Sequence, residues 1–258
     1  MGTILFSDIV FGPIKSRRLG SSLGVNLLPR HGKWCNFDCL YCECGFNKDG
    51  KQDKEIPGKE MVLNALREKI AELVKDNTAV DSITFSGNGE PTMHPDFPEI
   101  LEGTLLLRNN LIPSAKVSVL TNGSILGNEA VANALLKADN PIIKIDSANE
   151  ETISLLNRPN FKYSLSETVD LLKKFRHRFV LQTMFLRGEF QGKKIDNTTE
   201  TEVALWQRLV LQIHPREIMI YTIDRETPAS NLEKITVDEM KKISAPLLAT
   251  GYKITISG

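Results

Sequence analysis

Three cysteines lie within eight residues near the N-terminus, at Cys35, Cys39 and Cys42, in the run Cys-Asn-Phe-Asp-Cys-Leu-Tyr-Cys. Thiolates this close in sequence can converge on one soft metal centre, and thiolate is the ligand that iron-sulfur clusters require. A zinc ribbon would need two separated C-x2-C pairs, and a bacterial ferredoxin would need a fourth cysteine followed by proline. The spacing therefore favours a loop that carries an iron-sulfur cluster, with three structural or zinc-binding cysteines as the alternative.

The fourth and last cysteine of the chain is Cys44. A disulfide framework would distribute its cysteines along the chain, so this crowding indicates a reducing compartment. One remaining thiol cannot assemble a second cluster. Three roles stay open for Cys44: an inert structural thiol, an alternative ligand when cofactor is absent, or a hydrogen-bonding neighbour of the cluster.

A second informative stretch begins about 50 residues after the cysteines and reads Gly87-Asn88-Gly89-Glu90-Pro91. It follows a short strand predicted at residues 82–86. Two glycines let the backbone turn sharply and approach a ligand closely. Glu90 then stands at the carboxyl end of a strand, which is where α/β barrels place their chemistry.

Apolar periodicity predicts an alternation of strands and helices along the rest of the chain. Strands are expected at residues 23–28, 82–86, 117–120, 142–147, 179–185, 217–223 and 252–256, with residues 4–10 as a further strand or cover. Helices are expected at residues 59–73, 165–175, 200–211 and 237–249. Residues 45–58 and 190–199 are expected to be polar loops. Such alternation predicts an α/β fold with a parallel sheet and right-handed crossovers.

With both stretches in hand, the chain resembles the radical SAM enzymes, and Tyr41 directly before the last cysteine fits the pattern of that family. Residues 11–20, Phe-Gly-Pro-Ile-Lys-Ser-Arg-Arg-Leu-Gly, are similar to the N-terminus of a subgroup related to the wyosine-base, tRNA-modifying enzymes. The resemblance implies a single-domain partial (β/α)6 TIM-like barrel. Residues 1–22 would form an N-terminal cover and residues 23–258 the barrel.

The same resemblance implies two cofactors. A 4Fe-4S cluster would be held by Cys35, Cys39 and Cys42, and its open iron would chelate S-adenosylmethionine. Reductive cleavage would then give a 5′-deoxyadenosyl radical that abstracts hydrogen from the substrate. The resemblance implies that S-adenosylmethionine is bound by Gly87, Asn88, Gly89, Glu90, Pro91, Asn122, Asp146, Ser147, Gln182 and Tyr221. It assigns no catalytic residue.

The substrate remains open at this level. A tRNA nucleoside is one expectation, although the 32 Lys and Arg residues balance the 32 Asp and Glu residues and give no overall pull toward nucleic acid. A protein or peptide is a second expectation, and a non-catalytic iron-sulfur sensor or electron carrier is a third. An external one-electron donor of the flavodoxin or ferredoxin type is expected as a partner. The chain shows no signal-peptide pattern and no apolar run of membrane-spanning length, so no membrane partner and a cytoplasmic location are expected.

Overall fold

A computed structural model describes residues 4–50 and 53–258 of the chain. Residues 1–3 of the predicted cover and residues 51–52 of the predicted polar loop lie outside the described residues. The chain packs as two compact units, and each is described by itself. The N-terminal unit comprises residues 4–35 and 47–142, and the C-terminal unit comprises residues 36–46 and 143–258. Strand β5 (Asn140–Lys144) carries the chain from the first unit into the second.

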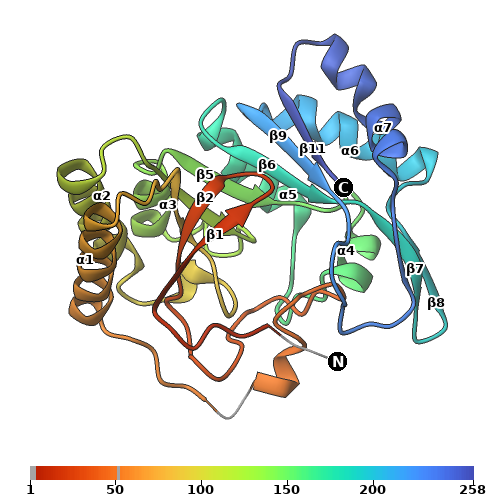
Figure 1. Cartoon of the computed structure of the whole chain (residues 1–258). Helices are drawn as coiled ribbons and strands as arrows, with labels where there is room; N and C mark the ends of the chain where they lie inside the picture. The colour runs from red at the N-terminus through yellow and green to blue at the C-terminus, as the bar shows by residue number, and fades with distance from the viewer. Residues whose placement is uncertain (1–3, 51–52) are drawn as a thin grey trace. The chain divides into compact units, whose positions relative to one another are not determined.

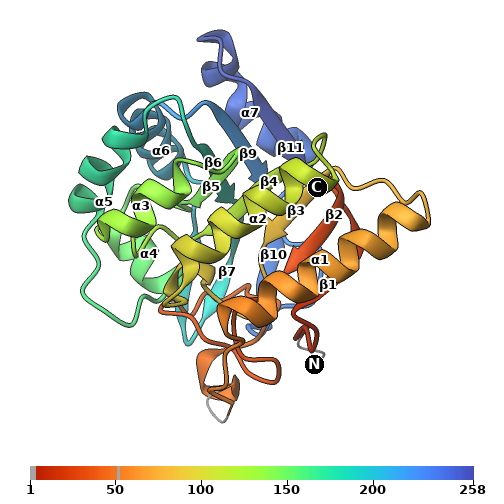
Figure 2. The ribbon, with the colours of Figure 1, turned by 90° about the vertical axis from the view of Figure 1, so that its left-hand side faces the viewer.

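The N-terminal unit is built on parallel strands (Figures 1 and 2). Strands β1 (Val10–Ser16) and β2 (Gly20–Val25) form an antiparallel hairpin, and β2, β3 (Ser82–Phe85) and β4 (Lys116–Thr121) then pair in parallel. The helices are α1 (Lys59–Lys75), α2 (Phe97–Leu111) and α3 (Glu129–Leu135), with 3-10 turns at Asn47–Gly50 and Pro91–Met93. Figure 2 shows α1 and α2 side by side, and the two helices are in contact.

The two faces of this sheet differ in chemistry because side chains alternate along each strand. Phe85 points toward α2 and meets the ring of Phe97, with centroids 6.0 Å apart. On the other face, the hydroxyl groups of Ser82 and Ser118 lie 2.9 Å apart. Both are buried, so each hydroxyl needs the partner that it has. The helix-facing side therefore carries the apolar core of this unit.

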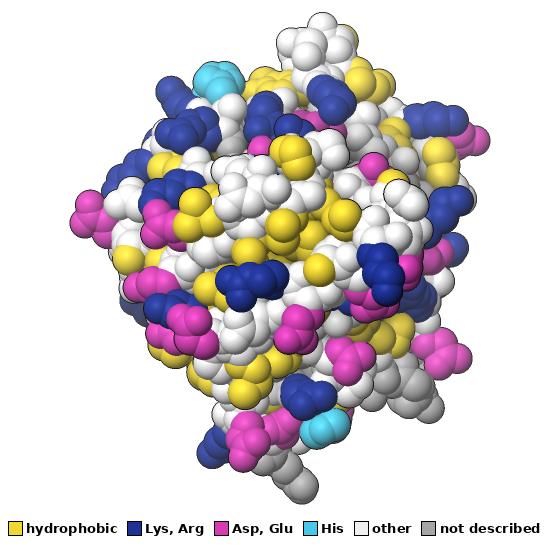
Figure 3. Space-filling model, turned by 60° about the vertical axis from the view of Figure 1, so that its left-hand side comes forward, with side chains coloured by type: hydrophobic (Ala, Val, Ile, Leu, Met, Phe, Trp, Pro, Cys, Tyr) yellow, Lys and Arg dark blue, Asp and Glu magenta, His cyan; other side chains and the backbone are white. Residues whose placement is uncertain are grey.

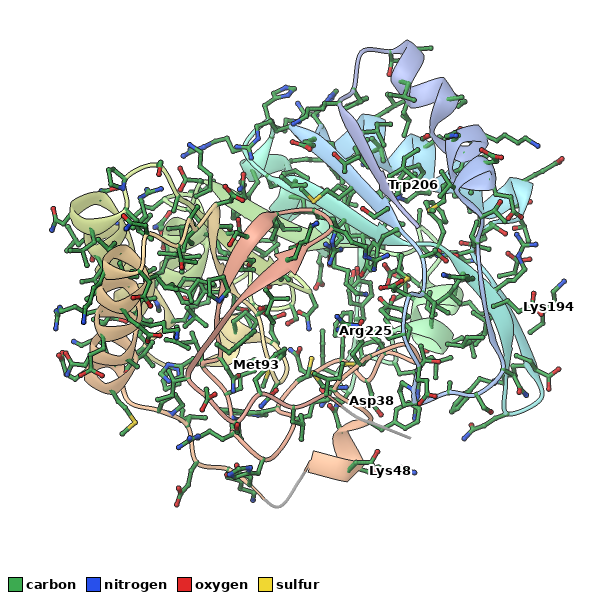
Figure 4. The ribbon with its side chains drawn as sticks, in the orientation of Figure 1. Asp38, Lys48, Met93, Lys194, Trp206 and Arg225 are labelled. Carbon is green, nitrogen blue, oxygen red and sulfur yellow. The ribbon has the colours of Figure 1, made fainter. Side chains whose placement is uncertain are left out.

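The C-terminal unit holds a second run of parallel strands, in the order β6 (Val180–Met184), β9 (Glu217–Tyr221) and β11 (Ile254–Ser257). A small antiparallel sheet contains β10 (Leu232–Lys234), β7 (Leu186–Phe190) and β8 (Lys193–Asp196). The helices are α4 (Glu150–Leu156), α5 (Leu165–Leu172), α6 (Glu200–Ile213) and α7 (Val237–Ala249), with a 3-10 turn at Lys173–Phe175. Trp206, marked on α6 in Figure 4, donates its indole N–H to Thr183 Oγ1 on β6 at 3.0 Å.

The predicted alternation of strands and helices is confirmed. The predicted bounds agree most closely with the observed bounds for the longest periodic segments. Helix α7 has the predicted bounds, and α1 and α6 begin at the predicted residues. The fourth predicted strand is wrong at its end, because β5 stops at Lys144 and leaves Asp146 and Ser147 beyond it. The predicted loop at residues 190–199 is also wrong, because β8 lies within it and forms a hairpin with β7.

The missed hairpin has a physical reason. Its two-residue turn, Gln191-Gly192, has φ values of 52° and 75°. Two consecutive positive φ values fit the turns that favour hairpins, and Asn-Gly or Asp-Gly is the usual signal for them. Glutamine at the first position gives a weaker signal in the sequence.

The predicted division into a cover at residues 1–22 and a barrel at residues 23–258 stays a prediction. Within the described ranges, no helix combines the length and the apolar character needed to cross a membrane.

Candidate functional site

The glycine turn after β3 is fixed against the residue that precedes the first cysteine. Trp34 donates its backbone N–H to Asn88 O at 2.9 Å, and its own carbonyl accepts from Glu90 N at 3.1 Å. Gly89 lies between Asn88 and Glu90 in the sequence and has φ +142°. A Cβ on this residue would lie 1.9 Å from Trp34 O. Only glycine allows this approach. Folding therefore holds the turn next to the start of the cysteine run, within the N-terminal unit.

Asn88, the residue between the two glycines, is fully buried and uses its side chain to bind the backbone. Its Nδ2 donates to Phe6 O at 3.0 Å and to Pro29 O at 2.7 Å, and its Oδ1 accepts from Phe6 N at 2.9 Å. These bonds join the turn to the N-terminal segment. The cofactor contact expected of Asn88 stays a prediction, and its side-chain amide would have to exchange one of these bonds to make it.

Glu90 connects the ends of two neighbouring strands. Its Oε1 accepts from Thr92 Oγ1 at 2.6 Å and from Thr121 Oγ1 at 2.7 Å, and its Oε2 accepts from Asn122 N at 2.7 Å. Burial raises the pKa of this carboxyl above its ordinary value, and the bonds from Asn122, Thr92 and Thr121 oppose the rise. The carboxylate thus holds the loop after β4 to the turn after β3.

Asn122 connects the Glu90 hydrogen bonds to a cysteine. Its Oδ1 accepts from Ser124 N at 2.9 Å, which fixes the orientation of the amide. The Nδ2 then faces Cys35, with 3.8 Å between Nδ2 and Sγ. Asn47 Nδ2 donates to the backbone oxygen of Cys35 at 3.0 Å. Three of the predicted residues in this unit, Glu90, Asn122 and Cys35, are therefore brought together.

In the C-terminal unit, the predicted residue Asp146 is the centre of a buried network. Its Oδ2 accepts from Tyr41 OH, from Lys144 Nζ and, at 2.6 Å, from Asn157 Nδ2. Its Oδ1 accepts from Met184 N at 2.9 Å. A buried carboxylate is retained when it is paired and hydrogen-bonded in this way. The expected contact between Asp146 and S-adenosylmethionine stays a prediction.

The charges in this network shift the pKa values of the neighbouring groups. Burial, the largest single influence, would lower the pKa of Lys144, but Asp146 together with Cys39 and Tyr221 outweighs it and raises that pKa well above its ordinary value. Burial, with Asp146 beside it, raises the pKa of Tyr41 well above its ordinary value. Lys144 is therefore a cation and Tyr41 a neutral phenol. Lys144 Nζ also lies 4.9 Å from the centre of the Tyr41 ring.

The cysteine loop is joined to the end of α4 by its backbone. Leu40 N donates to Leu156 O at 3.0 Å, and Asp38 N donates to Asn157 O at 3.0 Å. Figure 4 marks Asp38 in this loop. Cys39, between the two bonded residues, is buried, and its Sγ lies 3.5 Å from Asn157 Nδ2. Burial raises the pKa of the Cys39 thiol, and both Lys144 and the Asn157 amide oppose the rise.

The remaining predicted residues of this unit have different surroundings. Ser147 donates its hydroxyl to Glu202 Oε2 on α6 at 2.5 Å, so its side chain faces that helix. Gln182 lies on β6, and its side chain is on the opposite face of the strand from that of Thr183. It is buried. Among the described residues, its Nε2 has no hydrogen-bond partner. Tyr221 ends β9, level with Met184.

Asn157 is the residue that the sequence did not single out. It follows the last residue of α4, is 2% exposed, and contacts both Asp146 and Cys39. An asparagine at the end of a helix is an ordinary cap residue. Its sequence context therefore carried no signal for a second role.

The cysteines present donor chemistry that suits an iron-sulfur cluster. No disulfide involves any of the four, all of which are described residues, and Cys35 and Cys39 each accept from an asparagine amide. Amide N–H groups at sulfur favour the thiolate form that ligates iron. Among the described side chains, no three of His, Cys, Asp and Glu gather closely enough to hold one metal ion. A four-iron cube spreads its protein ligands over separate irons, so that finding concerns mononuclear sites.

Comparisons with known proteins give a consistent result. Residues 30–193 match the family described as the Radical SAM superfamily. The chain is 30% identical over 233 residues to a protein named GTPase Obg from Brachyspira hyodysenteriae, covering 90% of this chain and 32% of that protein. It is 29% identical over 243 residues to the UPF0026 protein MJ1312 of Methanocaldococcus jannaschii, covering 92% of this chain and 70% of that protein. The chain thus spans about a third of the first relative.

Two solved structures show the fold. A radical SAM methyltransferase from Sphaerobacter thermophilus superposes with a TM-score of 0.67 at 14% identity, covering 92% of this chain and 65% of that one. A structure of TYW1 with a lysine-pyruvate adduct bound gives a TM-score of 0.62 at 14% identity, covering 90% of this chain and 74% of that one. The predicted fold class, an α/β partial (β/α)6 barrel, is confirmed, as is the resemblance to the radical SAM enzymes.

Proposed function

The chain belongs to the Radical SAM superfamily, and from this premise we propose that it is an enzyme that cleaves S-adenosylmethionine reductively at a 4Fe-4S cluster. Cys35, Cys39 and Cys42 would hold the cluster. When bound, the two cofactors supply one electron and a sulfonium, which give methionine and a 5′-deoxyadenosyl radical that takes hydrogen from the substrate. The protein supplies binding, orientation and exclusion of water.

The observation that supports this proposal best is the contact between Asn157 Nδ2 and Cys39 Sγ. The Asn157 amide and the Lys144 cation both favour the thiolate form of Cys39, although burial outweighs them and leaves the pKa of the thiol raised. A merely structural buried cysteine would not need these groups. The second support is the pair of backbone bonds between Trp34 and the glycine turn, one donated by each side, which hold Asn88 and Glu90 next to the start of the cysteine run.

Binding of S-adenosylmethionine is proposed for residues at the carboxyl ends of the strands and for Gln182 within β6. In the N-terminal unit these are the backbone of Gly87, Gly89 and Pro91 and the side chains of Asn88, Glu90 and Asn122. In the C-terminal unit they are Asp146, Ser147, Gln182 and Tyr221. The unpartnered Nε2 of buried Gln182 supports its inclusion, because a buried amide donor without an acceptor is costly.

A tRNA nucleoside is the substrate class we favour, supported by the likeness to TYW1. The chain has no net charge, and Figure 3 shows Lys and Arg side chains among Asp and Glu side chains over the face in view. Recognition of RNA would therefore depend on local contacts rather than on overall attraction. An electron donor of the flavodoxin or ferredoxin type and a cytoplasmic location complete the proposal.

The test is anaerobic reconstitution of the purified protein with iron and sulfide, followed by dithionite and S-adenosylmethionine. The expected result is a cluster of four irons per chain and release of 5′-deoxyadenosine, even without substrate. A protein that carries zinc instead, or that loads four irons and releases no 5′-deoxyadenosine, would contradict the proposal. The second of these results would favour a sensor or electron carrier.

The substrate is then identified by isotope transfer. Candidate tRNA and peptide substrates carrying deuterium at exchange-inert carbons are incubated with the reduced enzyme, and 5′-deoxyadenosine is examined by mass spectrometry. Deuterium from the tRNA nucleoside supports the favoured class. Deuterium from a peptide, with none from tRNA, contradicts it.

A further inference from the structure

Asn157 stands between the carboxylate that organises the C-terminal unit and one of the cysteines. Its Nδ2 lies 2.6 Å from Asp146 Oδ2 and 3.5 Å from Cys39 Sγ. The same nitrogen lies 3.3 Å from Tyr41 OH. With 2% of its surface exposed, the side chain has little water to bind instead. Its contacts with protein groups therefore determine where its hydrogens point.

The chemistry of the neighbours fixes the orientation of the Asn157 amide. Asp146 is paired with the Lys144 cation, and an ionised carboxylate only accepts hydrogen bonds. The NH2 group of Asn157, and not its carbonyl, must therefore face Asp146. An NH2 group has two hydrogens. One goes to Asp146, and the other is directed to the side on which Cys39 Sγ and Tyr41 OH lie.

The backbone keeps this geometry in place. Met184 N holds the second oxygen of Asp146 at 2.9 Å, so the carboxylate cannot rotate freely. The bonds from Leu40 N to Leu156 O and from Asp38 N to Asn157 O lie on either side of Cys39 in the chain. The amide and the sulfur consequently belong to one rigid segment. The contact does not depend on a mobile loop.

We propose that Asn157 is a positioning residue that sets the reduction potential of the cluster through its hydrogen bond to Cys39 Sγ, and that Asp146 aims it. This inference rests on the proposed function, because it requires Cys39 to ligate the cluster. Reduction adds negative charge to the cluster and its sulfurs. A hydrogen bond to sulfur stabilises that charge, and such bonds are among the determinants of cluster potentials. Asn157 therefore makes the cluster easier to reduce.

Asn122 gives a graded comparison within the same protein. Its Nδ2 contacts Cys35 Sγ at 3.8 Å, which is longer than the 3.5 Å of the Asn157 contact. Loss of this amide should shift the potential in the same direction but by less. Asn122 lies in the N-terminal unit and Asn157 in the C-terminal unit.

The experiment measures the midpoint potential of the cluster in reconstituted protein without S-adenosylmethionine, by electron paramagnetic resonance during a redox titration. Asn157→Leu removes both amide hydrogens at similar side-chain volume. Asn157→Ser has one hydroxyl hydrogen in place of the two amide hydrogens, and the Asp146 carboxylate is a stronger acceptor for it than sulfur is. In both variants we expect the equilibrium constant for one-electron reduction to fall about tenfold, a shift of about 59 mV to more negative potential. Asn122→Leu should give a smaller shift of the same sign.

Asn149→Ala is the matched control. Asn149 caps the other end of α4, with its Oδ1 accepting from Glu151 N at 3.0 Å and its Nδ2 donating to Glu202, and among the described residues it contacts no cysteine. It should lower the melting temperature without moving the potential. Potentials of both Asn157 variants equal to the wild-type value would overturn the inference. Failure of both to load iron, while the control loads fully, would also overturn it, because a tuning residue leaves ligation intact. Wild-type protein that loads no 4Fe-4S cluster would refute the proposed function itself.

Discussion

Replacing Gly89 with alanine tests the idea that the glycine turn and the start of the cysteine run form one rigid piece. Gly89 has φ +142°, and a Cβ at this position would lie 1.9 Å from the carbonyl oxygen and 2.5 Å from the carbonyl carbon of Trp34. Both are backbone atoms, so no side-chain rotation relieves the clash. The chain must either open at this contact or move the segment that contains Trp34.

The cost can be estimated from the bonds that the contact contains. A non-glycine residue in this backbone region costs about 1–3 kcal/mol. Opening the contact also gives up the bonds from Trp34 N to Asn88 O and from Glu90 N to Trp34 O, at about 0.5–1.5 kcal/mol each. We therefore expect the free energy of unfolding to fall by about 2–6 kcal/mol. That is a large share of the roughly 5–15 kcal/mol by which most proteins are stable.

The measurement is urea unfolding of the cluster-free protein, followed by tryptophan fluorescence. Trp34 is 38% exposed and adjoins the changed contact, whereas Trp206 is buried in the other unit, so emission reports on both. Gly127→Ala is the control, because a Cβ at Gly127 meets nothing within 4 Å and its φ is not in the glycine-favouring region. The control should stay within about 0.5 kcal/mol of wild type. A Gly89→Ala protein as stable as the control would refute the reasoning.

Three further outcomes are expected. Cys39→Ala should abolish cluster assembly, measured by an iron and sulfide assay. Its control, Cys44→Ala, should retain four irons per chain. A full cluster in Cys39→Ala would show that Cys39 is not a ligand. Trp206→Phe should lower stability to urea by about 1–2 kcal/mol, because it removes a 3.0 Å bond to a buried hydroxyl, and an unchanged midpoint would contradict this. Bonds from Thr236 N and Oγ1, together with Arg187, lower the pKa of Glu239 from 4.5 to about 2. Its contribution is therefore complete above about pH 4.5 and is lost as pH falls toward 2, so the stability advantage of wild type over Glu239→Gln should shrink over that range in thermal unfolding.

Much of this protein can be predicted from local patterns. Apolar periodicity placed α1, α6 and α7, because the side chains that face the core repeat within one element. The glycine turn was predicted for a similar reason, since only glycine tolerates the φ values at Gly87 and Gly89. The Radical SAM family was also identified from short runs of sequence.

Tertiary structure decided how the polar groups are paired. Asn157 and Cys39 are 118 residues apart, and Tyr41 and Asp146 are 105 apart, so no periodic pattern joins them. Glu90 is likewise bonded to Thr121, 31 residues away, on the next strand. Apolar burial is non-directional and shows in the spacing of residues along one element. A hydrogen bond needs a donor and an acceptor at a set distance and angle, and only the folded chain brings those two atoms together.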